Sequence, residues 1–238
     1  MKYNNSYFAG ESTTHYDEGL RIYMLYIYRN MAMALGISAL VAYIVGSSEH
    51  LAMMLFSTPL VYAVMFAPLI YIFFFGRNLM SMDKERAMLH LGIFATLNGL
   101  SLGSIFLVYT AASIAKTFFI TASTFGAMSI YGHTTKKDLT AAGSFAYMGL
   151  IGLVIASLIN IFLRSAALDF AVSFIGVGVF TILTAYDTQK LKSIYYAMNG
   201  NTARAGNIAV YGALTLYLDF INLFIMLLHF FGIKRSDD

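Results

Sequence analysis

Long apolar runs separated by short polar segments are the main pattern along this chain. Each run has about 20 or more residues, the length that an α-helix needs to cross a bilayer. Helices are expected because an isolated apolar segment must satisfy its own backbone hydrogen bonds in lipid. The pattern therefore predicts an all-α, polytopic membrane protein with seven transmembrane helices. The predicted spans are residues 26–46, 51–75, 87–110, 113–132, 141–162, 168–187 and 207–231.

The polar residues divide the chain into three parts. Residues 1–25 are predicted to form a polar N-terminal tail, residues 26–233 the transmembrane domain, and residues 234–238 a short C-terminal tail. The first 20 residues lack the apolar core and small-residue cleavage site of a signal peptide, so we expect a short frayed segment. Pro59 and Pro68 both fall in the second span, where proline can kink a membrane helix.

The composition agrees with a chain that lies mostly in lipid. Hydrophobic residues make up 59% of the 238 residues and charged residues only 11%. A soluble domain has about 45–50% apolar and about 25% charged residues, so this composition excludes ordinary soluble and disordered chains. The absence of cysteine excludes a disulfide framework and a thiolate metal site. The net charge of +3 does not indicate nucleic-acid binding, because the basic residues lie in short loops between apolar runs.

The distribution of lysine and arginine predicts the orientation in the membrane. Eleven of these residues lie in the N-terminal segment and in the loops after the second, fourth and sixth spans, and four lie on the opposite side. Basic residues are concentrated in cytoplasmic loops. We therefore expect a cytoplasmic N-terminus and, with seven spans, a C-terminus on the other side.

Asp219 is an ionisable residue at the midpoint of the last predicted span. A charged side chain there costs about 2.5–3.5 kcal/mol on insertion scales, so such a residue indicates a functional site by default. At about 100° per residue, other polar residues fall on the same side of the helix. The seam predicts a proton or cation pathway, although a buried aspartate that only packs against a neighbouring helix is the alternative. The seam comprises Asn207, Tyr211, Thr215, Asn222 and His229, with Thr215 and Asn222 nearest to Asp219.

Asp187 ends the sixth predicted span. As the spans are drawn, its carboxylate lies about 18 Å from the depth of Asp219, so the two meet only if one helix is longer or shorter than drawn. Facing carboxylates would share a proton. They would also offer oxygen ligands to a hard cation such as calcium. Arg77, at the cytoplasmic end of the second span, lies at the membrane level of Asp187 and is a candidate latch that protonation would release.

The sequence gives little support for an enzyme. Residues 99–103 read Gly-Leu-Ser-Leu-Gly, which matches the nucleophile-elbow string of hydrolases. That motif requires a strand-to-helix turn and partner residues. Here it lies inside a predicted span, where close helix packing through the glycines explains it better. We expect no catalytic residue and no resident cofactor.

Four segments resemble one family of membrane proteins. They are Tyr-Asp-Thr-Gln at 186–189, Leu-Tyr-Leu-Asp-Phe-Ile-Asn-Leu-Phe at 216–224, Phe-Phe-Gly-Ile at 230–233 and Thr-Lys-Lys-Asp-Leu at 135–139. These segments resemble the Bax inhibitor-1 family, also called the transmembrane Bax inhibitor motif family. The ending and the short polar tail are similar to bacterial members, which implies a bacterial inner membrane.

The resemblance implies a seven-helix bundle in which the other six helices enclose the last one. It also implies a pH-sensitive calcium-leak channel in which Asp187 and Asp219 sense protons and an arginine, matched here to Arg77, latches one of them. Calcium would then be the transported ion. Some bacterial members resemble partners of a membrane-bound AAA protease, which gives a second hypothesis, a non-transport regulator that binds through residues 1–20.

Overall fold

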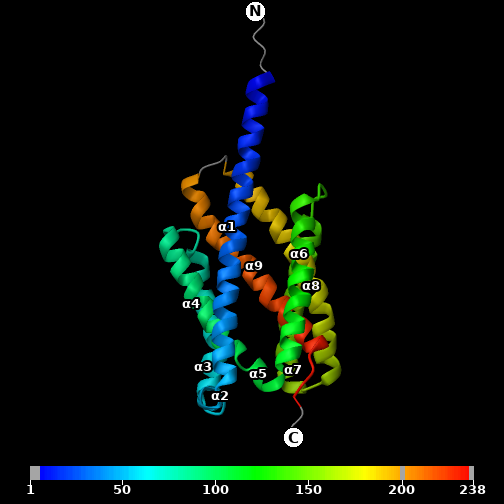
Figure 1. Ribbon diagram of the computed structural model, residues 1–238. Coiled ribbons are helices and arrows are strands. Elements are labelled where there is room, and N and C mark those ends of the chain that lie inside the picture. The colour runs from blue at the N-terminus through cyan, green and yellow to red at the C-terminus, as the bar shows by residue number, and fades with distance from the viewer. Residues whose placement is uncertain (1–5, 199–201, 236–238) are drawn as a thin grey trace, which may run out of the picture.

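The computed structural model is a bundle of long helices (Figure 1). It describes residues 6–198 and 202–235, and the side chains within them except those of 6–17, 77 and 202–205. The described residues contain no strand, only an isolated bridge between Tyr109 and Lys234. The elements are α1 (Ser6–Ser47), α2 (Glu49–Phe56), α3 (Leu60–Phe75), the 3-10 helix η1 (Gly76–Asn78), α4 (Lys84–Leu102), α5 (Ile105–Val108), α6 (Ala111–Thr134), α7 (Thr140–Leu163), α8 (Ala166–Ala197) and α9 (Thr202–Phe231).

The predicted all-α membrane architecture is confirmed, but the count of seven spans is not. Within the described residues, five helices are long and apolar enough to cross a membrane, and the bent pair α2–α3 would make a sixth. The predicted span at 113–132 corresponds to α6, which does not reach that apolarity. Its residues Thr117, Thr121 and Ser129 are buried where α6 packs along α8 and α9.

The last helix lies at the centre of the bundle, as expected. α9 packs against α1, α4, α6 and α8, and Figure 1 shows it running obliquely behind α1 and α6. Ala213, Leu216, Tyr217 and Leu223 of α9 are completely buried. In contrast, α7 packs mainly on α8 and leaves most of its surface to the surroundings.

The first helix begins earlier than the predicted boundary at residue 26. α1 runs from Ser6, and its membrane-compatible part starts at Glu18. Buried residues at the spacing of one helix face explain this start, namely Leu20, Tyr23, Met24, Ile27, Met31 and Ala34. Arg21 and Arg29 lie on the exposed side of the helix. Their charges make this part of the sequence look like a polar tail, although one face of the helix is buried.

The second predicted span is broken, which corrects the single helix expected at 51–75. α2 and α3 meet at an angle of 80°. Pro59 has no backbone N–H and cannot continue the preceding helix. The Thr58 hydroxyl donates to the Met54 carbonyl at 2.7 Å and accepts from the Leu60 N–H at 3.3 Å, so it satisfies backbone groups at the break. Pro68 lies inside α3, so the break is at Pro59.

The sixth predicted span ends too early at residue 187. α8 continues to Ala197, which places Asp187 inside the helix. Leu191 and Tyr195 carry the buried face past Asp187 at four-residue spacing. The charged ends of Lys190 and Lys192 do not stop the helix. Lys192 donates to the His133 carbonyl at 3.0 Å, and Lys190 lies over the Tyr186 ring.

Gly99 and Gly103 bring α4 close to α1. A Cβ on Gly99 would come within 2.8 Å of the Ser38 carbonyl oxygen, and one on Gly103 within 2.6 Å of a Val45 methyl group. Residues 99–103 are helical or in the turn that follows, and no strand precedes them. The nucleophile-elbow string is therefore a helix-packing motif, as expected.

Candidate functional site

Asp187 of α8 and Asp219 of α9 meet in the interior of the bundle. Both side chains line one cleft, and their carboxyl groups are close enough to interact electrostatically. Asp187 is 2% exposed and Asp219 is 5% exposed. The predicted spans place the two residues at different depths in the membrane. α8 continues past Asp187, which allows the two side chains to meet. Two carboxylates at such close range resist joint ionisation, so the pair titrates as one unit.

The surroundings of the pair provide few compensating groups. The Tyr147 hydroxyl, from α7, donates to the two Asp187 carboxyl oxygens at 3.2 and 3.3 Å. Lys190 attracts Asp187 electrostatically from the next turn of α8. Among the described residues, Asp219 Oδ2 is buried without a hydrogen-bond partner. A buried carboxylate oxygen without a partner is costly, which makes the pair a candidate site for a proton or a cation.

The two carboxyl groups lie in a cleft of about 570 Å³ between α3, α7, α8 and α9. Thr215 and Asn222 line the same cleft, so the sequence-predicted seam residues nearest to Asp219 do lie beside the pair. Each of these two side chains also donates to a carbonyl one turn earlier in α9, at 3.1 Å from Thr215 and 2.8 Å from Asn222. The cleft therefore presents carboxyl, hydroxyl and amide oxygens on one side.

The remaining four predicted residues lie in different places. Tyr211 lines the cleft, whereas Asn207 lines a separate small cavity. His229 lies at the far end of α9, where its ring stacks on Tyr109 with the ring centres 6.3 Å apart. The side chain of Arg77 lies outside the described part of the chain, and its neighbours Gly76 and Met80 line the cleft.

The pair alone does not form a complete metal site. Within the described residues there is no group of three or more histidine or acidic side chains placed to hold a metal ion. Calcium takes six to eight oxygen ligands. A calcium ion at Asp187 and Asp219 would need further oxygen ligands from Tyr147, Thr215, Asn222 or water. Such a site suits an ion that binds transiently better than one that stays bound.

The Tyr-Asp-Thr-Gln segment contacts several neighbouring elements. Tyr186 packs against Gly143 of α7, where a Cβ would overlap its ring. Thr188 hydrogen-bonds Ser129 of α6 at 3.0 Å. Gln189 accepts from the Leu139 N–H at 2.9 Å and donates to the Lys137 carbonyl at 2.8 Å. Successive helical residues point about 100° apart, so this segment connects α8 to α6, to α7 and to the loop between them.

We expect Gln189→Ala to loosen the connection between α6 and α7. The substitution removes two hydrogen bonds to that loop, for a total loss of about 1–3 kcal/mol. Hydrogen–deuterium exchange should therefore accelerate at residues 135–139. Ser193→Ala is the matched control, because Ser193 lies one turn later on α8 and bonds only to the Gln189 carbonyl. Unchanged exchange in Gln189→Ala would show that other contacts hold the loop.

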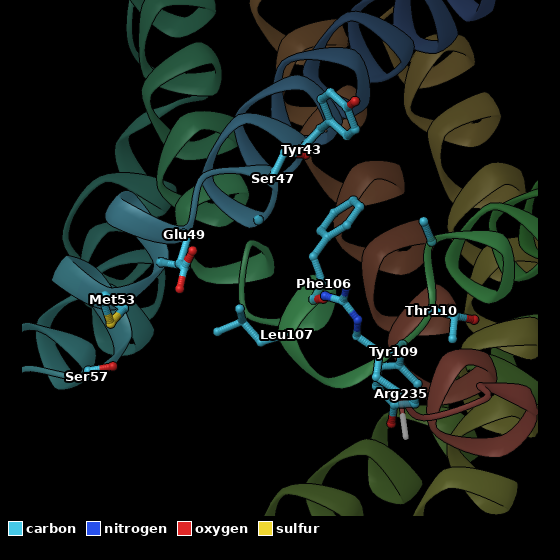
Figure 2. Close-up of a pocket in the computed structure, with 13 residues that line it drawn as sticks. Tyr43, Ser47, Glu49, Met53, Ser57, Phe106, Leu107, Tyr109, Thr110 and Arg235 are labelled. Atoms are coloured by element: carbon cyan, nitrogen blue, oxygen red, sulfur yellow. The ribbon is translucent and has the colours of Figure 1, made fainter. Parts of the chain in front are cut away.

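A larger cavity lies at the other end of the bundle and is separate from the carboxyl pair. It measures about 810 Å³ and shares no lining residue with the cleft. Figure 2 shows Glu49 and Arg235 on opposite sides of it. The chain after α9 closes one wall, because the Thr110 N–H donates to the Ile233 carbonyl and the Arg235 N–H to the Val108 carbonyl. The Phe-Phe-Gly-Ile segment thus has a structural role, and Gly232 fits under the Tyr109 ring.

Comparison with known proteins gives matches over nearly the whole chain. A family model described as "Inhibitor of apoptosis-promoting Bax1" matches residues 20–236. An uncharacterized protein of Rickettsia prowazekii is 48% identical over 93% of both chains. One of Caulobacter vibrioides is 44% identical over 98% of this chain and 97% of its own. The inner membrane protein YbhL of Escherichia coli is 44% identical over 91% of this chain and 94% of its own.

Proposed function

From the premise that this chain belongs to the Bax inhibitor-1 family of integral membrane proteins, we propose that it is a pH-dependent calcium leak of a bacterial inner membrane. One observation carries the proposal. Two acidic side chains from different helices meet in the interior of a membrane bundle, at the wall of a cleft. Buried intramembrane carboxyl groups are characteristic of ion and proton pathways.

Protonation of the pair is the proposed gating event. At neutral pH the pair carries negative charge and attracts Arg77, the predicted latch, which keeps the cleft closed. At low pH both carboxyl groups are neutral, the attraction for arginine is lost and the cleft opens. Calcium then passes the oxygen atoms of Asp187, Asp219, Thr215 and Asn222. The Tyr147 hydroxyl donates to Asp187, and Lys190 attracts it from the next turn of α8.

The same proposal includes the orientation. The ends of α6 and α8 and the start of α4 lie at the end of the bundle where lysine and arginine are concentrated. The excess of basic residues supports a cytoplasmic position for this end. The cleft of the carboxyl pair then opens toward the cytoplasm and the cavity beside Arg235 toward the other side.

Calcium entry into liposomes tests the leak. Purified protein in liposomes that contain a calcium indicator should admit calcium faster at acidic than at neutral pH. Liposomes without protein measure the background at each pH. A rate equal to this background at both pH values would contradict the leak.

A protease regulator is the second candidate, and one observation favours it. The first turns of α1 project beyond the neighbouring helices (Figure 1). Such a projecting helix is accessible to a membrane-bound AAA protease. Deletion of residues 1–17 spares Leu20 and the buried face that follows it. Loss of a co-purifying protease with unchanged calcium flux would favour this function, and unchanged co-purification would argue against it.

A further inference from the structure

A second site is suggested by a groove between α1 and α6, away from the carboxyl pair. Within the described residues, α1 packs mainly on α4 and α9, and α6 packs mainly on α8 and α9, so the two helices make little contact with each other. The space between them has a volume of about 760 Å³. Figure 1 shows the two helices running along the same side of the bundle with α9 behind them.

One end of the groove is positively charged. Arg21 of α1 and Lys192 of α8 line it there, together with His133 near the end of α6. None of the described residues that line the groove is acidic. Lys192 donates to the His133 carbonyl, which holds its ammonium group at the mouth of the groove. Arg21 is exposed. Two permanent positive charges from separate helices therefore meet at one end.

The rest of the groove is mainly apolar, apart from a hydrogen bond of 2.8 Å between the hydroxyls of Tyr28 on α1 and Ser129 on α6. Met24, Met31, Phe125 and Phe220 form its wall and floor. A second hollow of about 410 Å³ continues from Phe220 toward the other face of the membrane, between the same two helices. The occupant suited to this shape has a negative head and a long apolar tail.

We propose that this groove binds an anionic phospholipid. Its phosphate group is held by Arg21 and Lys192, and one acyl chain lies along Phe125 and Phe220. Basic sites between membrane helices are known to bind acidic lipid head groups. A transmembrane helix of a partner protein would fill the apolar part but would leave the two positive charges without a counterion.

The charged end is tested by native mass spectrometry of the purified protein in detergent. After delipidation, phosphatidylglycerol or phosphatidylcholine is added at equal concentration. We expect one phosphatidylglycerol molecule to be retained at least roughly tenfold more strongly than phosphatidylcholine. The variant Arg21→Gln with Lys192→Gln should lose this preference. Lys136→Gln with Lys137→Gln is the matched control, because it removes two exposed charges from the nearby α6–α7 loop.

The apolar part is tested by filling it. Gly126 lines the groove, and a Cβ there would have no atom within 4 Å, so Gly126→Leu is expected to fold and to occupy the space. This variant should not retain phosphatidylglycerol. Gly152→Leu on α7 is the control, since Gly152 also has open space around it and lies outside the groove.

Two results would overturn the proposal. One is equal retention of the two lipids by the unmodified protein. The other is a loss of the preference in the loop control as large as in the groove variant. Both measurements are independent of calcium flux, so they do not depend on the function of Asp187 and Asp219.

Discussion

Asp187→Asn combined with Asp219→Asn is expected to abolish the pH dependence of calcium flux. Asparagine has the shape of a protonated aspartate and cannot ionise, so the double variant resembles the open, low-pH state at every pH. Flux at neutral pH should rise to the acidic value of the unmodified protein, with an acid-to-neutral ratio of about one. The measurement is calcium entry into liposomes at the two pH values.

Asp169→Asn is the matched control for this experiment. Asp169 lies in the first turn of α8, eighteen residues before Asp187, or about 27 Å along the helix. The change removes a carboxyl group from the same bundle without touching the pair. A ratio in the double variant equal to that of the unmodified protein would exclude the carboxyl pair as the pH sensor.

Gly132→Ala is expected to destabilise the whole bundle. Gly132 lies where α6 crosses α8, and a Cβ there would overlap the Ala185 carbonyl oxygen. That oxygen belongs to the backbone of α8 and cannot rotate away, so the helices must separate. Overpacking of this kind costs about 1–3 kcal/mol. The measurement is the temperature at which half of the monodisperse protein is lost in size-exclusion chromatography.

Gly126→Ala on the same helix controls for the change of residue type. No atom lies within 4 Å of a Cβ at that position. Alanine favours helix over glycine by roughly 0.5–1 kcal/mol, so this variant should be as stable as the unmodified protein or more so. Equal stability of Gly132→Ala and Gly126→Ala would mean that the α6–α8 crossing tolerates a wider separation.

The long apolar runs were enough to predict a helical membrane bundle, but not the ends of its helices. Lys190 and Lys192 made residue 187 look like the end of a span, because charged residues usually mark the boundary of the membrane. In the structure these side chains reach the Tyr186 ring and the His133 carbonyl, so the helix continues beneath them. In the same way, the charge of Arg21 made the first span appear to start later than α1 does.

The candidate site was predictable only where a residue is unusual for its place in the sequence. Asp219 is noticeable at the middle of an apolar run, and Thr215 and Asn222 follow from helical spacing. Tyr147 gave no such signal, since it is one of 17 tyrosines and its role depends on the packing of α7 against α8. Gln189 was part of a recognised motif, but its bonds to Lys137 and Leu139 depend on a loop 50 residues earlier.

The central position of α9 has a consequence for the biogenesis of this protein. A chain is synthesised from its N-terminus, so the helix that completes the core leaves the ribosome after helices α1 to α8. Until it inserts, Ser38 lacks the Tyr217 hydroxyl that bonds it at 2.7 Å. Asp187 likewise lacks its partner Asp219 until α9 inserts. The earlier helices must therefore remain in the bilayer as an incomplete bundle, and a ribosome that stalls before residue 202 leaves a product without a core.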